Sequence, residues 1–367
     1  MTTVREVCNH LKQLAPLNIA EDWDNVGLLL GDELTEIQRV LTCLTLTSDV
    51  AAEAVSLGAG LIVTHHPVMF KPLKKITTDN PEGRMLLTLA RHNIAVYSPH
   101  TAWDNSDSGI NQQLAERLEL QEIAPLRARF EEHVKLVTFV PEAQLQSVRE
   151  ALWAVGAGTI GNYLNCSFSL PGTGTFFGTE TTNPTIGQPG QLESVAEIRL
   201  EVICKTRLLE KAIAALRAAH PYEEPAIDIF AVKSLAETAG SGRVGNLPQP
   251  MKLAELNRIV SERLNVTPVQ FVGQPSQLIT RVGIACGAAA EFLREAHRKG
   301  CRAFVTGEAR FHACLEARDL GVGMILPGHF ATERFAMETL AQLLTVHFPK
   351  LAVSASETET DPVQTST

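Results

Sequence analysis

The sequence lacks any long hydrophobic run. No stretch of its 367 residues approaches the roughly 20 apolar residues that a membrane-spanning helix needs, and the first ten residues contain no apolar signal core. We therefore expect a soluble, cytoplasmic protein with no membrane partner. Apolar residues still make up 45% of the chain, which is enough for a large core, and the length favours two or more domains.

An excess of positive charge is also lacking. The 32 basic and 41 acidic residues give a net charge of −9, so nucleic acid is not the expected partner. The seven cysteines are scattered and form no Cys-x-x-Cys pair, which excludes a disulfide framework and a zinc ribbon. We expect most of them to be small buried apolar residues, and none to be catalytic.

Both ends of the chain alternate short apolar runs with amphipathic segments, a pattern typical of α/β folds. Strands are predicted at residues 37–46, 61–64, 94–98, 281–285, 303–306 and 322–326. Helices are predicted at residues 48–57, 84–92, 288–298 and 309–318, and from about residue 331 onward. Such alternation predicts largely parallel sheets covered by helices.

The two ends also resemble each other. Residues 58–66 (GAGLIVTHH) align without a gap with residues 300–308 (GCRAFVTGE). In each end a Pro-led loop follows the next strand and carries a histidine four residues before a carboxylate: His100 and Asp104, then His329 and Glu333. We therefore predict two similar α/β halves that face one site.

Between the halves, the order of predicted elements is βαβ followed by βαβ, which indicates a ferredoxin-like α+β insert. The predicted divisions are 1–126 and 247–353 for the two halves of one metal-binding domain and 127–246 for the insert. Residues 354–367 are polar and rich in Thr and Glu, so we expect a disordered tail.

Several metal-ligand residue types follow predicted strands, where ligand sites lie in parallel α/β sheets. These residues are His65, His66, His100, Asp104, Glu308, His329 and Glu333. Imidazoles and carboxylates suit zinc, manganese, iron or nickel, and two adjacent ions need five or more such ligands. Taken singly, two adjacent histidines are more often hydrogen-bonded or solvated than metal ligands, and a histidine four residues from a carboxylate is more often a pair on one helix face. Their common place at strand ends favours a metal site.

Five segments resemble, in order, the signatures of the Nif-three-like family. They are Trp23-Asp-Asn-Val-Gly27-Leu, Thr64-His-His-Pro67, Pro99-His-Thr-Ala-Trp-Asp104, Thr306-Gly-Glu308 and Gly328-His-Phe-Ala-Thr-Glu333. Members are described as hexameric proteins with a dinuclear metal centre, and many are named as homologues of GTP cyclohydrolase I type 2. The resemblance implies the metal ligands His65, His66, Asp104, His329 and Glu333. It also implies a homohexamer, and it leaves His100 and Glu308 on the substrate side or behind the ligands.

The middle segment resembles the PII and CutA-like insert of longer family members. The likeness rests on residues 156–163 and on His220-Pro-Tyr-Glu-Glu-Pro225. Residues 156–161 form a Gly-x-Gly-x-x-Gly string, but it follows a predicted helix, so we expect tight turns and not a dinucleotide site. His220 precedes a proline, and we expect it to order that loop.

Two divalent ions favour hydrolysis, because such pairs activate water at neutral pH. We predict His100 or Glu308 as the proton shuttle, since the resemblance requires neither as a ligand. Lys71, Lys74 and Lys75 could receive the phosphates of a nucleotide, or they could form a solvated basic loop. Two alternatives stay open: a metal-binding assembly without turnover, and a regulatory hexamer whose insert senses a ligand.

Overall fold

The computed structural model describes residues 2–161 and 163–364, and the chain divides into two compact units. The larger unit comprises Met1–Arg129 and Glu237–Thr367, and the smaller unit comprises Phe130–Ala236. Two long strands run from one unit into the other: β7 (Gln121–Val140) and β10 (Ile227–Lys252). The sequence predicts an insert that ends at residue 246, whereas the smaller unit ends at Ala236. The difference arises because the last part of β10 belongs to the larger unit.

The N-terminal half of the larger unit is built on a five-stranded sheet with the order β15-β4-β5-β6-β2. The strands are β2 (Gly27–Leu30), β4 (Arg39–Thr45), β5 (Leu61–His66), β6 (Ala95–Ser98) and β15 (Ala352–Ala355). Its helices are α1 (Val4–Leu14), α2 (Ser48–Leu57), α3 (Pro81–Arg91), α4 (His100–Asn105) and α5 (Ile110–Arg117). Strands β15, β4, β5 and β6 are mutually parallel, and β2 is antiparallel to β6. A short ladder of β1 (Thr2–Thr3) and β3 (Glu36–Ile37) precedes α1 and β4.

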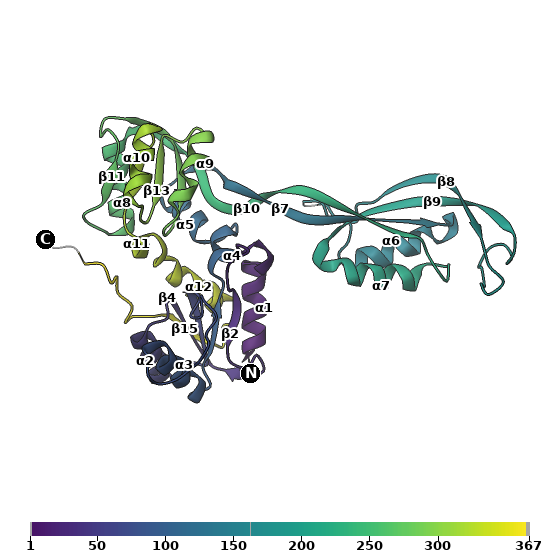
Figure 1. Ribbon diagram of the computed structural model, residues 1–367, viewed down its shortest axis with the longest axis horizontal. Helices are drawn as coiled ribbons and strands as arrows, with labels where there is room; N and C mark the ends of the chain where they lie inside the picture. The colour runs from purple at the N-terminus through teal and green to yellow at the C-terminus, as the bar shows by residue number, and fades with distance from the viewer. Residues whose placement is uncertain (1, 162, 365–367) are drawn as a thin grey trace. The chain divides into compact units, whose positions relative to one another are not determined.

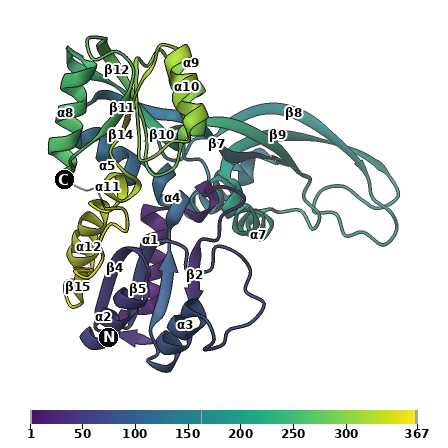
Figure 2. The same cartoon turned by 60° about the vertical axis from the view of Figure 1, so that its left-hand side comes forward.

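Alternation along each strand buries both faces of this sheet. In β4, Val40 and Leu44 pack with α1, whereas Leu41 and Cys43 pack with α2 and α3. Strands β5 and β6 divide their side chains in the same way. Figures 1 and 2 show α2 and α3 together beside this sheet. The buried strands explain the continuous apolar runs of the sequence.

The C-terminal half repeats this arrangement. Its elements are α8 (Leu253–Leu264), β11 (Gln270–Val272), β12 (Leu278–Ala285), α9 (Leu293–Arg298), β13 (Ala303–Thr306), α10 (Phe311–Asp319), β14 (Gly323–Leu326), α11 (His329–Glu333) and α12 (Ala336–His347). Strands β12, β13 and β14 are parallel neighbours in the sheet. Strand β11 lies beside β14 and is antiparallel to it, although β11 comes before all three in the chain. The order β12-β13-β14-β11 matches β4-β5-β6-β2, which confirms the prediction of two similar halves. Only the central strands of this second sheet are parallel, because β10 joins β12 antiparallel.

One hydrophobic core joins the two halves. It contains Val40 and Leu61 from the first sheet, Val282 and Val305 from the second, and Leu114 of α5. The hydroxyl of Thr42 in β4 also donates to the backbone carbonyl of Met337 in α12 at 2.8 Å. The halves therefore fold as one unit although 107 residues of the smaller unit separate them in sequence.

The smaller unit has a ferredoxin-like topology. Its remaining elements are α6 (Leu145–Ala154), β8 (Phe168–Phe177), β9 (Leu192–Lys205) and α7 (Leu209–Ala219). The strand order is β10-β7-β9-β8, and β9 is antiparallel to both neighbours. With the chain order βαββαβ, this is the arrangement predicted from the sequence. Gly156, Gly158 and Gly161 all have positive φ, in keeping with the predicted tight turns after α6.

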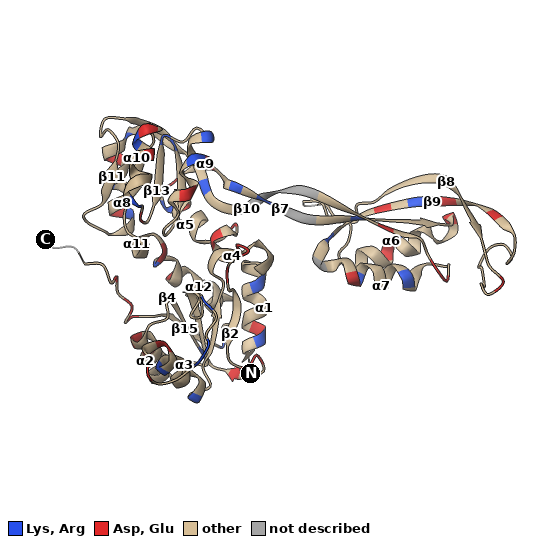
Figure 3. Cartoon of the chain, viewed as in Figure 1, with Lys and Arg blue, Asp and Glu red and all other residues tan. Residues whose placement is uncertain are grey.

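The cysteines, the apolar segments and the charged residues are arranged as follows. All seven cysteines are free, and five of them are buried. Within the described residues, no helix is long and apolar enough to cross a membrane. Figure 3 shows acidic and basic residues interspersed along both units, as in the bands of alternating charge on β9.

The chain from Ser354 onward differs from the predicted disordered tail. Ser354 and Ala355 belong to β15, and the side chain of Glu359 is only 4% exposed. The Glu359 carboxylate accepts hydrogen bonds from the backbone of Leu44 and Thr45 and pairs with Arg334 at 2.8 Å. The acidic composition suggested solvation, but these backbone donors at the end of β4 supply specific partners. Residues 365–367 lie outside the described residues.

We predict that Glu359→Ala lowers the free energy of unfolding by about 3 kcal/mol, because it removes a buried carboxylate that accepts from two backbone N–H groups and is one of the two acidic partners of Arg334. Urea denaturation followed by circular dichroism measures this change. The matched control is Glu357→Ala, which removes an exposed carboxylate two residues away and should change stability by less than about 0.5 kcal/mol. Equal effects of both substitutions would contradict a specific role for Glu359.

Candidate metal centre

Strand β5 ends in the two adjacent histidines, His65 and His66. Pairing of Thr45 with His66 across β4 and β5 sets the register. The Thr45 hydroxyl lies 2.7 Å from Nδ1 of His66, which leaves Nε2 of His66 to point toward Glu333 at 3.2 Å. His65 is buried, and its backbone carbonyl accepts a hydrogen bond from Ser98 at 2.6 Å. The strand end is therefore fixed on both sides.

The C-terminal half contributes α11, a short helix that begins at His329 and ends at Glu333. The four-residue spacing places both side chains on one helix face, and Nε2 of His329 lies 3.1 Å from Oε2 of Glu333. Nδ1 of His329 lies 2.9 Å from the carboxylate of Glu308, which follows β13. Glu308 thus orients the His329 ring from the side away from Glu333.

The loop after β6 contributes α4, which carries His100 and Asp104. His100 has φ 28, in the left-handed region, so its backbone is held in an uncommon conformation. Its Nδ1 lies 2.7 Å from Oδ1 of Asp24, and Oδ2 of Asp24 accepts from the backbone N–H of Thr101 at 3.1 Å. Figures 1 and 2 show α4 and α11 lying between the two sheets of the larger unit.

Three buried polar atoms in this cluster have no hydrogen-bond partner among the residues that the structure describes: both ring nitrogens of His65 and Oδ1 of Asp104. Nε2 of His65 faces that oxygen at 3.6 Å, which is too long for a hydrogen bond. Leaving such groups unsatisfied is costly, but the separation suits two ligands of one ion with bonds of about 2 Å. Two overlapping groups have the geometry to hold a metal ion: His65 with His66 and His100, and His66 with His329 and Glu333.

Burial and neighbouring charges shift the pKa values of the residues in this cluster in different directions. Burial raises the pKa of Asp104 far above that of an ordinary carboxyl, and the charge of Glu333 adds to this effect. Burial would also raise the pKa of Glu333, but hydrogen bonds from His329 and His66 outweigh it and lower that pKa. The hydrogen bond to Glu333 raises the pKa of His329 to about 9, whereas burial lowers the pKa of His65. A cation would satisfy both carboxylates and the neutral His65 ring together.

A cavity of about 540 Å³ opens onto the cluster. Its mouth carries Trp23 and Phe70, two exposed aromatic side chains whose ring centroids lie 5.7 Å apart. Both rings also lie near His100, at 6.1 and 6.3 Å between centroids. The amide of Asn25 donates to the carbonyl of Met69 at 2.7 Å, which joins the two loops that carry these rings.

The three lysines that follow the histidine pair do not line this cavity. Lys75 instead pairs with Asp79 at 3.3 Å, and its side chain is well exposed. Among the described residues, Arg127 is the one lysine or arginine that contributes to the lining. Of the two interpretations of the lysines, the arrangement favours the solvated loop.

All seven site residues predicted from the sequence come together, five of them on the cavity wall. His66, His100, Asp104, His329 and Glu333 line the cavity, His65 lies beneath them, and Glu308 lies behind His329. Sequence reasoning missed Asp24 and Thr45, which orient histidines, although Asp24 sits in a segment used for the family resemblance. It also missed Gly287, where a side chain would lie 2.3 Å from Oε1 of Glu333.

We predict that Gly287→Ala lowers the metal content of the purified protein at least tenfold, because the added methyl group displaces Glu333. Metal content is measured by elemental analysis after dialysis. Gly321→Ala is the matched control, because Gly321 has φ 65, close to the φ 67 of Gly287, but no atom within 4 Å of the added methyl group. That control should lose about 1 kcal/mol of stability and keep its metal. Full metal content in Gly287→Ala would contradict this placement of Glu333.

Comparison with known proteins identifies relatives along nearly the whole chain. Residues 2–362 match the model of the Duf34/NIF3 (NGG1p interacting factor 3) family. A protein of Halalkalibacterium halodurans is 38% identical over 352 residues, covering 95% of each chain, and one of Bacillus subtilis is 36% identical, covering 98% of this chain and 97% of the other. Both are named "GTP cyclohydrolase 1 type 2 homolog".

Solved structures show the same fold. A Bacillus cereus protein related to NIF3 is 34% identical and superposes with a TM-score of 0.86, with coverage of 100% of this chain and 99% of the other. A Staphylococcus aureus protein is 28% identical, with a TM-score of 0.83 and coverage of 99% of both chains. These matches confirm the family resemblance drawn from the five sequence motifs.

Proposed function

Because the chain belongs to the Duf34/NIF3 family, we propose that its histidine and carboxylate cluster binds two divalent metal ions and that the protein hydrolyses a purine nucleotide. One observation carries this proposal: within the described residues, the ring nitrogens of His65 and Oδ1 of Asp104 are buried without hydrogen-bond partners, next to an accessible cavity. The names of the relatives support the class of reaction, in which water opens the imidazole ring of the purine.

The proposed ligands are His65, His66, Asp104, His329 and Glu333. Nε2 of His66 can serve one ion, with His329 and Glu333. His65 and Asp104, whose ligand atoms lie 3.6 Å apart, are then left for a second, adjacent ion. When bound, such ions lower the pKa of water and polarise the atom under attack. Iron, zinc, manganese and nickel all accept this set of nitrogen and oxygen donors.

The mouth of the cavity supports a planar substrate. Trp23 and Phe70 are both more than half exposed, which is a costly way to place large apolar rings unless a ligand covers them. Aromatic side chains stack on the faces of nucleobases, worth about 1–3 kcal/mol per base. These two rings would hold the base close to His100, which lies between them and the histidine pair.

Of the two proton-shuttle residues predicted from the sequence, the geometry favours His100. Asp24 holds Nδ1 of His100, so its Nε2 is the atom that exchanges a proton at the cavity. Glu308 is engaged by His329 and does not line the cavity. We therefore assign Glu308 to positioning a ligand. His100 also lies within ligand distance of His65 and His66, so its test must include metal content.

A second function, metal binding without turnover in a regulatory hexamer, is favoured by one observation. The smaller unit has a cavity of its own, separate from the residues of the metal cluster. The homohexamer implied by the resemblance, and a nucleotide as substrate, stay predictions.

We predict that Asp104→Ala removes at least half of the bound metal and abolishes the release of formate from GTP, because Asp104 supplies a buried ligand oxygen. Elemental analysis and a formate assay measure the two effects. The control, Asp107→Ala, removes an exposed carboxylate three residues away and should change neither. Metal bound by the wild type without hydrolysis of any nucleotide would support the second function and overturn the first.

We predict different effects for substitutions at His100 and Glu308. His100→Gln should lower kcat by about 10²–10⁴ at normal metal content, which is the usual contribution of a proton shuttle. Glu308→Gln should weaken metal binding about 10–100-fold and recover its kcat at saturating metal, because Glu308 only orients His329. Kinetics at several metal concentrations separate the two. Loss of metal in His100→Gln would make His100 a ligand and contradict this assignment.

A further inference from the structure

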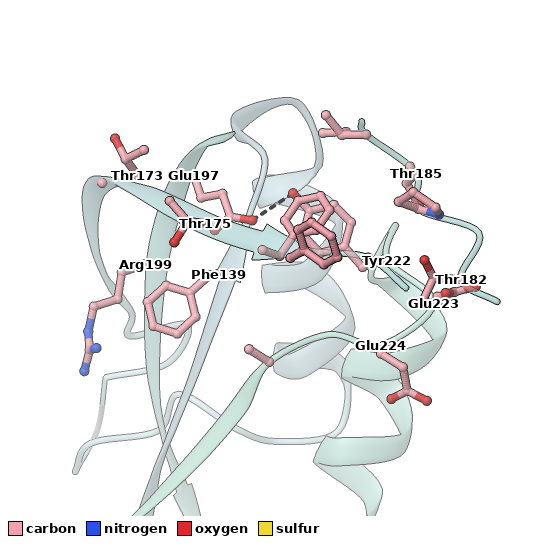
Figure 4. A pocket seen from close by; sticks show the side chains of 18 of the residues that line it. Phe139, Thr173, Thr175, Thr182, Thr185, Glu197, Arg199, Tyr222, Glu223 and Glu224 are labelled. Carbon is pink, nitrogen blue, oxygen red and sulfur yellow. Dashed lines mark hydrogen bonds between the residues drawn. The ribbon is translucent and has the colours of Figure 1, made fainter. Parts of the chain in front are cut away.

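The smaller unit contains a cavity of about 650 Å³ that the proposed hydrolase function does not use. Its walls come from β7, β8, β9 and the loop after α7, as the close-up in Figure 4 shows. A volume of this size suits a small organic molecule.

The His220–Pro225 loop forms one wall of this cavity and is firmly attached to the sheet. His220 is buried, its Nε2 donates to the carbonyl of Phe139 at 3.1 Å, and its Nδ1 accepts from the backbone N–H of Tyr222 at 3.2 Å. The bond that Nδ1 accepts requires the neutral ring, and burial lowers the pKa of His220, which favours that form. His220 therefore orders the loop, as the sequence predicted, and it fixes Tyr222 at the cavity.

The loop between β8 and β9 closes the opposite side. The hydroxyl of Thr185 donates to the carbonyl of Pro221 at 2.7 Å, and the backbone N–H of Asn183 donates to Glu223 at 3.1 Å. These bonds connect two loops 36 to 40 residues apart in sequence. These contacts wall the cavity on one side, and the rest of it is open to solvent.

Glu197 of β9 is the unusual group inside the cavity. The hydroxyl of Tyr222 donates to its Oε1 at 2.8 Å, the bond drawn in Figure 4. Within the described residues, Glu197 has neither an ion pair nor a second hydrogen bond. Gly174 lets the other oxygen, Oε2, lie against β8, because a side chain there would approach it to 2.1 Å.

The other charged groups that line the cavity have partners outside it, including Glu223, which accepts from the backbone of Asn183. Arg199 bonds Glu201 at 2.9 Å, and its guanidinium lies over the ring of Phe139 at 5.6 Å. Glu224 lies 3.5 Å from Arg217 and is largely exposed. Glu197 is therefore a half-buried negative charge without a compensating cation, and this costs free energy that a bound cation would recover.

Aromatic rings line the same cavity as this carboxylate. Phe139, Phe176, Phe177 and Tyr222 all line the cavity, and Phe177 is 61% exposed. Ring faces attract cations, and the attraction is stronger where water is excluded. A carboxylate among aromatic rings is a combination that recognises organic cations in particular, since neither an anion nor a neutral apolar molecule would satisfy Glu197.

We propose that this cavity binds a small organic cation with a planar amidinium or an ammonium nitrogen, which pairs with Glu197 and packs against Phe139 and Tyr222. This site lies in the smaller unit and does not depend on the proposed hydrolase function.

The test uses the full-length, metal-loaded protein and three probes of nearly equal shape: benzamidinium, benzamide and benzoate. Isothermal titration calorimetry should give saturable binding of benzamidinium, at least tenfold weaker binding of benzamide, and none of benzoate. Asp104→Ala should bind benzamidinium as the wild type does, so failure of the metal site leaves this result intact. Equal affinity for benzamidinium and benzamide, or no binding of benzamidinium, would overturn the proposal.

Two substitutions locate the site. Glu197→Gln keeps an acceptor for Tyr222 but removes the charge, and it should weaken benzamidinium at least tenfold. Glu224→Gln removes the same charge from the rim of the same cavity and should leave the affinity within twofold, since Glu224 is already paired. An equal loss in both variants would indicate general electrostatic attraction and would refute a specific role for Glu197. Melting temperatures of both variants confirm that they are folded.

Discussion

The contact between Glu333 and His66 is the constraint on which the larger unit depends. These residues stand 267 positions apart and belong to different halves, yet their side chains meet at 3.2 Å with Glu333 almost fully buried. A buried carboxylate is tolerated only when positive or hydrogen-bonding partners compensate it. The shared hydrophobic core places the two halves so that His66 and His329 provide this compensation. The site is therefore formed by the packing of the halves and by neither half alone.

Much of this arrangement could be predicted from the sequence, because it follows from periodicity and from the positions of strand ends. Apolar runs such as residues 61–64 mark buried parallel strands, and polar residues directly after them must meet at one edge of the sheet. This reasoning placed each histidine at the end of a strand. The matching segments 58–66 and 300–308 then predicted two similar halves that face one site, and the strand orders of the two halves agree with this.

The rest could not be predicted, because it depends on tertiary contacts without a local pattern. Gly287 matters only because Glu333 packs against it, and Glu359 is ordered only because the end of β4 offers unpaired backbone N–H groups. The roles of His100 and Glu308 looked equivalent in sequence. Their partners distinguish them, since Asp24 leaves one nitrogen of His100 at the cavity whereas His329 engages Glu308.

Strand β15 has a consequence for how the chain is made. It pairs with β4 along Ala352–Ala355 and completes a sheet whose other strands all lie before residue 99. On the ribosome, β4 therefore presents an unpaired edge until residues 352–355 have emerged, and such edges are where chains aggregate. The smaller unit is one continuous segment, so it can fold during that interval. The N-terminal sheet can close only after residues 352–355 have emerged and found β4.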